Sequence, residues 1–255
     1  MTDFNLIVKL FFRKIVFLFL LFLFMYLDSN QLAENFEHGF LILNILSFIA
    51  FFYLIKRSRV KVKQLLICYV IAALLTEYYF SLYLEAYSYK RKYIPLYVLF
   101  GHAIIYERIY TFSKASVVKR NKIIIHAVYI FVILLLGAFF FFLKNDYFGL
   151  FLTFIFFLFV FILKRARTYF LTSYIVLVVL ELLGVYFGCW TWKEYGFGYF
   201  NFIPSSNPPI GISICYFIIT SLAYFIYFLL NKELWNRFKR INLKNFNKGI
   251  TITQK

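Results

Sequence analysis

Long apolar stretches, separated by short polar and basic segments, dominate the chain. A helix needs about 20 apolar residues to cross a bilayer, where its backbone must satisfy its own hydrogen bonds. The pattern predicts an all-α fold, a polytopic transmembrane helical bundle of about eight spans. The predicted spans are residues 10–27, 39–55, 65–84, 94–112, 123–143, 148–163, 169–187 and 209–230. Because only residues 144–147 join the fifth and sixth spans, a merged or re-entrant hairpin is an alternative there.

The basic residues give an independent prediction of topology, because Lys and Arg concentrate in short cytoplasmic loops. With the N-terminus inside, the inner segments hold 22 of the 28 Lys and Arg, including a basic tail at 231–255. The outer segments hold five, three of them at 90–92. We therefore expect both termini in the cytoplasm of a bacterium and the bundle, residues 1–230, in its inner membrane. Residues 28–31 lack a small-residue cleavage pattern, so the first span is expected to be an uncleaved anchor.

Composition agrees with a membrane location. The chain is 63% hydrophobic with a mean hydropathy of +0.78, whereas soluble domains are roughly 45–50% apolar. The net charge of +17 does not indicate a nucleic-acid partner, because the cations lie in short segments between apolar runs. The expected partners are membrane lipids and a hydrophobic small-molecule substrate. Three widely spaced cysteines show no disulfide or zinc pattern, and Cys68 and Cys215 are expected to be packing residues.

Two segments of the chain have a similar order of residue types. Each has an acidic residue inside a span, then an aromatic-hydroxyl-aromatic-Lys sequence at the outer surface, then a proline before the next span. These residues are Glu77, Tyr87-Ser88-Tyr89-Lys90 and Pro95 in the first segment, and Glu181, Trp190-Thr191-Trp192-Lys193 and Pro204, Pro208 and Pro209 in the second. Four spans separate them, which predicts parallel repeats at 1–112 and 113–230. Chance similarity in so aromatic a chain is the alternative.

Charged residues inside the spans are the main candidates for chemistry, since each costs about 2.5–3.5 kcal/mol at the centre of a bilayer. Glu77 and Glu181 each lie twelve residues into a span, about 18 Å from the inner surface. His102 lies about 12 Å from the outer surface, which is the same level in a core of about 30 Å. We therefore predict catalytic acid/base roles for Glu77, Glu181 and His102. In the alternative interpretation these groups only lock helices together. Glu107 and Arg108 lie near the inner surface, where we expect the arginine to extend toward the interface and the glutamate to pair with it.

Neighbouring residues complete the predicted site. The stripe Glu77, Ser81, Glu85 and Ser88 falls on one helix face, and Gly184 and Gly188 share a face with Glu181. The outer loop at 188–209 is predicted to form a structured lid. The predicted substrate-binding residues are Trp190, Trp192, Tyr87, Tyr89 and Asn207. Without His-x-x-x-His or Glu-x-x-His spacing, the sequence predicts neither a metal nor a cofactor.

The pattern Glu181-x-x-Gly184-x-x-x-Gly188, followed by paired aromatics and a proline-led span, resembles carotenoid-processing membrane proteins. These are the membrane-embedded lycopene cyclases and the carotenoid hydratases. The resemblance implies that intramembrane acids protonate a polyene, a role that would fall on Glu181 and Glu77. The Pro-x-Glu-Glu sequence of the cyclases does not occur in this chain.

Three functional hypotheses follow from the sequence. The first is an enzyme that performs acid/base chemistry on a lipid or isoprenoid. The second is a transporter or proton-coupled carrier, whose two repeats would rock against each other. No predicted span has a central proline or a Gly-Pro pair, which favours the enzyme over the carrier. The third is a non-catalytic membrane scaffold. The sequence does not indicate an oligomeric state.

Overall fold

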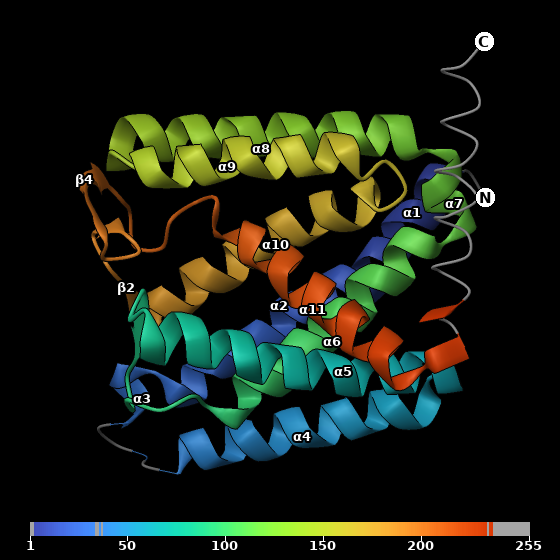
Figure 1. Ribbon diagram of the computed structural model, residues 1–255, viewed down its shortest axis with the longest axis horizontal. Coiled ribbons are helices and arrows are strands. Elements are labelled where there is room, and N and C mark those ends of the chain that lie inside the picture. Colours follow the sequence, from blue (N-terminus) through green and yellow to red (C-terminus); the bar gives the residue numbers. More distant parts are fainter. Residues whose placement is uncertain (1–2, 34–35, 37, 234, 237–255) are drawn as a thin grey trace.

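The chain folds into a bundle of helices that run between two ends of the molecule (Figure 1). The computed structural model describes residues 3–33, 36, 38–233 and 235–236. We call the end with the four short β-strands the strand end. The opposite end, which holds the links at 58–59, 115–121 and 163–166, is the basic end. It gathers the loops that the charge pattern assigns to one side of the membrane.

Each predicted apolar stretch is helical. The N-terminal stretch is a segmented helix made of α1 (Asp3–Phe11), a π segment η1 (Phe12–Val16), α2 (Phe17–Leu23) and a 3-10 segment η2 (Phe24–Asp28). The other helices are α3 (Asn30–Ala33), α4 (Gly39–Arg57), α5 (Val60–Glu77) with a π segment η3 (Tyr78–Tyr83), α6 (Leu96–Lys114), α7 (Ser116–Arg120), α8 (Lys122–Lys144), α9 (Tyr147–Ile162), α10 (Arg167–Tyr186), η4 (Ile212–Ile214) and α11 (Cys215–Leu230). The fifth and sixth stretches are thus two separate helices, α8 and α9.

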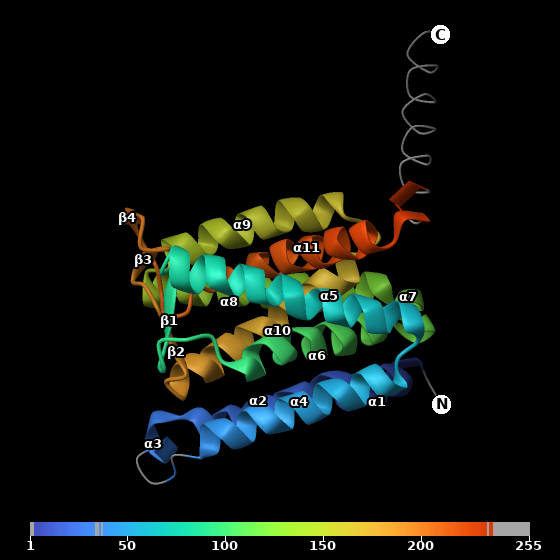
Figure 2. The ribbon, with the colours of Figure 1, turned by 60° about the horizontal axis from the view of Figure 1, so that its bottom comes forward.

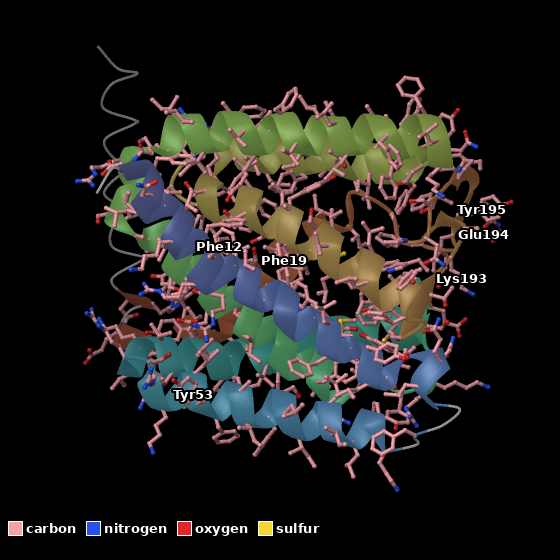
Figure 3. The ribbon with its side chains drawn as sticks, turned by 180° about the vertical axis from the view of Figure 1, so that it is seen from behind. Phe12, Phe19, Tyr53, Lys193, Glu194 and Tyr195 are labelled. Atoms are coloured by element: carbon pink, nitrogen blue, oxygen red, sulfur yellow. The ribbon has the colours of Figure 1, made fainter. Side chains whose placement is uncertain are left out.

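Five helical segments within the described residues are long and apolar enough to cross a membrane: α4, α5 with η3, α8, α10, and η4 with α11. Helix α9 is also apolar but shorter, at 16 residues. Large apolar side chains such as Ile123, Phe131 and Phe142 are exposed on the outside of the bundle. Figure 3 shows the N-terminal helix crossing the back of the bundle obliquely, with Phe12 and Phe19 along it. Such an apolar exterior is typical of a protein surrounded by lipid.

The centre of the bundle consists of α5, α6, α10 and α11. Helix α5 packs against α6 and α11, and α10 packs against α6. Helix α4 covers α6 on one side, while α8 lies along α10 and α9 lies along α8 (Figures 1 and 2). The α2 segment packs on α10. Polar residues on the inner faces of α5, α6, α10 and α11 therefore meet in the interior of the bundle.

Four short strands close the strand end. They are β1 (Tyr87–Tyr89), β2 (Trp190–Trp192), β3 (Tyr195–Gly196) and β4 (Phe200–Pro204). Strand β1 pairs antiparallel with β2, and β3 with β4. The segment at 188–209 is thus a structured element, as its glycines and prolines predicted. The tail at 231–255 is described only for residues 231–233 and 235–236, so its predicted course lies outside the described residues.

Asp146 joins the α8–α9 turn to the segment that leads into α11. The side chain is fully buried and accepts hydrogen bonds from the backbone N–H groups of Gly149 (2.9 Å), Ser206 (3.0 Å) and Ile210 (2.7 Å). A Cβ atom at Gly211 would overlap the carbonyl oxygen of Gly149, so the two backbones approach closely only because these positions lack side chains. One carboxylate therefore fixes the start of two helices.

We expect Asp146→Ala to destabilise the bundle by roughly 3 kcal/mol or more, because three buried N–H groups lose a charged acceptor. Equilibrium unfolding of the purified protein in detergent measures this change. Asp3→Ala is the matched control, since Asp3 pairs with Arg120 on the exposed surface at 2.8 Å. It should cost less than about 1 kcal/mol. Equal effects of the two changes would contradict the anchoring role of Asp146.

Candidate active site

Glu77 and His102 form a buried hydrogen-bonded pair in the half of the bundle nearer the strand end. Glu77 is the last residue of α5 before its π segment, and His102 lies on α6. The Nε2 atom of His102 is 2.9 Å from Oε1 of Glu77. The other oxygen, Oε2, accepts hydrogen bonds from the hydroxyls of Tyr87 and Tyr89, the latter at 2.5 Å. The Glu77 carboxylate therefore has partners on both oxygens.

Tyr216 of α11 completes a three-residue chain with this pair. Its hydroxyl lies 2.8 Å from Nδ1 of His102. In a neutral imidazole, Nε2–H donates to the carboxylate of Glu77, which leaves Nδ1 to accept from the Tyr216 hydroxyl. The carboxylate thus orients the imidazole, and the imidazole orients the phenol. This arrangement can pass a proton from one end of the chain to the other.

Glu181 of α10 is held by two indole rings. Its Oε2 accepts hydrogen bonds from Nε1 of Trp190 (2.8 Å) and Nε1 of Trp192 (3.0 Å). Both rings are buried. Oε1 of Glu181 accepts no hydrogen bond from the described residues. One oxygen is therefore fixed by donors, and the other is available to a bound molecule.

The strands β1 and β2 bring these four aromatic side chains together. Tyr87 lies opposite Trp192 and Tyr89 opposite Trp190, with their ring centroids 4.4 and 6.1 Å apart. We call this pair of strands the aromatic ribbon. Each strand carries the side chains that donate hydrogen bonds to the carboxylate preceding it in the sequence. Burial and the neighbouring Glu77 carboxylate raise the pKa of Tyr87 and of Tyr89 well above the usual range, so both hydroxyls stay protonated and donate.

A small cavity of about 70 Å³ joins the three predicted catalytic residues. Glu77, His102 and Glu181 all line it, together with Tyr216 and Cys215. Counting residues along the helices predicted that the three titratable groups lie at the same level of the bundle. In the fold, all three line this one cavity. Cys68 is a fully buried packing residue, but Cys215 borders this cavity, which the sequence did not predict.

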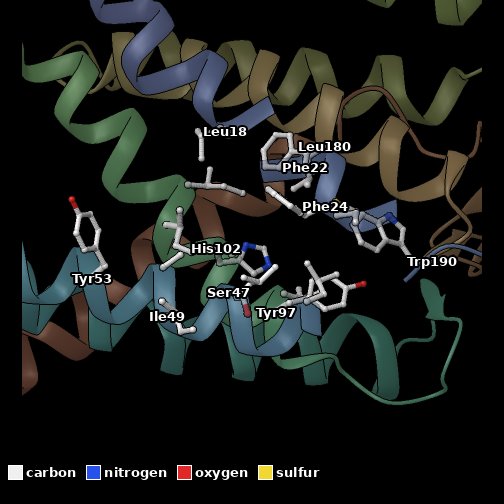
Figure 4. A pocket seen from close by; sticks show the side chains of 18 of the residues that line it. Leu18, Phe22, Phe24, Ser47, Ile49, Tyr53, Tyr97, His102, Leu180 and Trp190 are labelled. Carbon is white, nitrogen blue, oxygen red and sulfur yellow. The ribbon is translucent and has the colours of Figure 1, made fainter. Parts of the chain in front are cut away.

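A larger apolar cavity of about 390 Å³, whose lining is drawn in Figure 4, adjoins the small one. Both cavities are lined by Val98, His102, Leu180, Trp190 and Tyr216. The remaining walls come mainly from the N-terminal helix and from α4 and α6.

Four lining residues of the apolar cavity, Phe24, Leu46, Ile49 and Tyr53, are 40–57% exposed on the outside of the bundle. The cavity therefore reaches from the outside of the bundle to the imidazole of His102.

The predicted substrate-binding residues mainly hold the site together. Tyr87 and Tyr89 bind Glu77, while Trp190 and Trp192 bind Glu181. The side-chain oxygen of Asn207 accepts from the backbone N–H of Trp192 at 3.0 Å and so fixes β2. Trp190 also lines the apolar cavity, which leaves it in position to contact a bound molecule.

The predicted polar stripe on the third span is only half present. Ser81 is buried next to Glu77, but Glu85 and Ser88 are exposed. The helix changes to π geometry at Tyr78 and ends at Tyr83, which rotates later residues away from the expected face. Glu85 then takes a left-handed backbone conformation with φ of 49°. The extension of the stripe to Glu85 and Ser88 was therefore wrong.

Two parts of the site were not predicted from the sequence. Tyr216 lies seven residues after Pro209, about 10 Å into the last span, so the same depth count could have found it. The apolar cavity had no signal in the sequence, because its walls are ordinary apolar residues.

Near the basic end, Glu107 and Arg108 approach to 3.6 Å, in agreement with the expected pairing. The described residues contain no group of three or more His, Cys, Asp or Glu that could hold a metal ion.

The comparisons with known proteins give no family for this chain. No family model, no curated protein and no solved structure matches it.

Gly184 lets the aromatic ribbon approach α10. A Cβ atom at this position would overlap the indole ring of Trp190, whose N–H binds Glu181. We expect Gly184→Ala to displace this ring and to destabilise the protein by about 1–3 kcal/mol through overpacking. Detergent unfolding and tryptophan fluorescence measure the two effects. Gly101→Ala is the control, because a Cβ there meets nothing within 4 Å, and it should be neutral or stabilising.

Proposed function

We propose that the chain is an integral membrane protein with eight spans, adding α6, α9 and the segmented N-terminal helix to the five long apolar segments. The first residue of α1 and the last residue of α11 both lie at the basic end, as an even number of crossings requires (Figure 1). The charge distribution supports a cytoplasmic basic end in a bacterial inner membrane.

We also propose that the two halves, 1–112 and 113–230, are parallel repeats. In each half, an intrahelical carboxylate accepts hydrogen bonds from the strand of the aromatic ribbon that belongs to the same half. A second correspondence is independent of these strands. Asp28, buried after the first span, accepts from the hydroxyl of Tyr97 at 3.0 Å near the start of α6. Asp146, buried after the fifth span, accepts from the backbone N–H of Ile210 in the segment before α11.

The proposed function is acid/base catalysis on a lipid or isoprenoid substrate. One observation carries this proposal: an apolar cavity reaches from the outside of the bundle to a small cavity lined by two carboxylates and an imidazole. The large cavity suits a hydrocarbon chain, and the small one suits the few atoms at which a proton is transferred. Ligand sites are commonly apolar with a few convergent polar groups.

The expected chemistry is a proton transfer that gives an isomer of the substrate. Glu181, in its protonated form, donates a proton from Oε1 to one carbon of an alkene. The chain Tyr216–His102–Glu77 accepts a proton from a neighbouring carbon, so that the double bond shifts or a ring closes. No oxidant or reductant is needed, and the proton count is unchanged. Protonation of the alkene gives a carbocation. Because the carboxylates lie beside apolar walls, this carbocation loses a proton to the chain rather than reacting with water.

Carotenoid-like polyenes fit this proposal as one substrate class. The expectation rests on the pattern of Glu181, Gly184 and Gly188 with the following tryptophans, and on the apolar cavity. A polyene offers the conjugated double bonds that an intramembrane acid can protonate. Other isoprenoids with an alkene share this chemistry.

A proton-coupled carrier is the second candidate, and one observation favours it. Hydroxyl groups continue from the site toward the basic end, where Tyr69 and Tyr169 lie 3.0 Å apart and Tyr106 and Tyr224 also 3.0 Å apart. Thr220, one turn after Tyr216 on α11, hydrogen-bonds to Tyr69. A carrier would move protons along these groups, so proteoliposomes loaded with a pH-sensitive dye would acidify when substrate is added. An enzyme would change the substrate and leave the internal pH constant.

We expect Glu181→Gln and Glu77→Gln each to lower product formation roughly 100-fold, the scale of general acid/base catalysis. Mass-spectrometric lipid and pigment profiles of cells that produce each variant provide the measurement. A precursor should accumulate and its isomer should disappear. Glu85→Gln is the control, because it makes the same chemical change at an exposed position that does not line either cavity. An unchanged lipid and pigment inventory in both site variants would remove the enzyme proposal.

A further inference from the structure

A second polar cavity, of about 860 Å³, lies at the basic end, away from the candidate active site. It is bounded by α6, α7, α8, α10 and α11. Five cationic side chains line it: Lys114, Lys119, Lys122, Lys164 and Arg165. They come from two stretches of the chain, 114–122 and 164–165, and the fold brings them around one space. We call it the basic cavity.

The charge around the basic cavity is not neutralised by nearby acids. No Asp or Glu lines it. Among the described residues, none of the five cations forms an ion pair, since the pairs there join other residues. The sequence agrees, because no acidic residue occurs between Arg108 and Asp146 or between Asp146 and Glu181. A cavity with several unpaired cations and no acid attracts an anion.

The inner wall of the basic cavity offers neutral hydrogen-bonding groups. The hydroxyl-bearing residues Tyr106, Tyr169, Thr220 and Tyr224 line it, as does the imidazole of His126. Tyr106, Tyr169 and Thr220 are buried, so their positions are fixed by packing. Cations at the rim with hydroxyls below them are typical of sites for phosphate oxygens, which accept several hydrogen bonds at once.

We propose that the basic cavity binds a phosphate-bearing anion. The ligand is either the headgroup of an anionic phospholipid or a free phosphate or diphosphate, and both present the same oxygens. The rule that loops on one side of a membrane are basic accounts for the presence of these cations but not for their convergence on a cavity. The site is independent of Glu77, His102 and Glu181.

The test uses the purified full-length protein in phosphatidylcholine nanodiscs. One arm measures binding of inorganic diphosphate by calorimetry. The other arm adds phosphatidylglycerol and counts the lipid molecules retained, by native mass spectrometry. Binding in the first arm identifies a soluble anion, and selective retention in the second identifies a lipid headgroup. Either result supports the site, whereas no binding in both arms overturns it.

Variants separate a built site from general charge attraction. The triple change Lys122→Gln, Lys164→Gln and Arg165→Gln should weaken binding roughly tenfold or more. The control triple change Lys56→Gln, Lys61→Gln and Lys63→Gln removes the same charge from the same end without touching the cavity, and should leave binding within about twofold. Equal losses in the two triple variants would overturn the proposal.

Ser221→Trp gives a test that keeps every charge. Ser221 lines the basic cavity and is exposed, so a large side chain there should fill the space while the bundle stays folded. Thermal unfolding in detergent checks the fold of this variant. We expect binding to fall roughly tenfold, as occupied space excludes the ligand. Unchanged binding by folded Ser221→Trp would show that the anion does not enter the cavity.

Discussion

A carboxylate inside an apolar helix bundle must be met by hydrogen-bond donors, because an unpaired buried charge costs several kcal/mol. Much of this structure follows from that requirement at Glu77 and Glu181. Their donors are not on the helices that carry them. Four of them come from the aromatic ribbon, where two tyrosines donate to Glu77 and two tryptophans donate to Glu181. The fifth is the imidazole of His102 on α6, the other partner of Glu77. The pairing of the two strands at the surface therefore holds in place the donors that the two carboxylates need in the interior.

The ribbon can reach these carboxylates only because the backbone gives it space. Gly184 leaves room for the ring of Trp190, and the π segment after Glu77 lets the chain leave α5 toward β1. Asn207 then fixes the backbone of β2 from the opposite side. At the other edge of the strand end, Asp146 binds three backbone N–H groups and holds the entry to α11, which carries Tyr216. Small residues and buried acids at the strand end thus position the groups around the small cavity.

The two ends of the molecule offer different chemical environments. Toward the strand end, titratable side chains adjoin apolar walls that reach the outside of the bundle. At the basic end, cations surround a space whose inner wall carries hydroxyl groups. The Tyr69, Tyr169 and Thr220 cluster lies on the central helices between them. A long amphiphilic ligand and a small anion would therefore find separate places in the same bundle.

The sequence by itself determined the helices and the depth of the candidate groups. Hydrophobic length decides where a helix can cross a bilayer, so helices occur in all eight predicted stretches. A constant rise per residue likewise placed Glu77, His102 and Glu181 at one level. Helix geometry along one chain does not say which helices are neighbours or where a helix changes its winding. The contact of His102 with Tyr216, the end of the polar stripe before Glu85, and both large cavities were therefore decided only by tertiary packing.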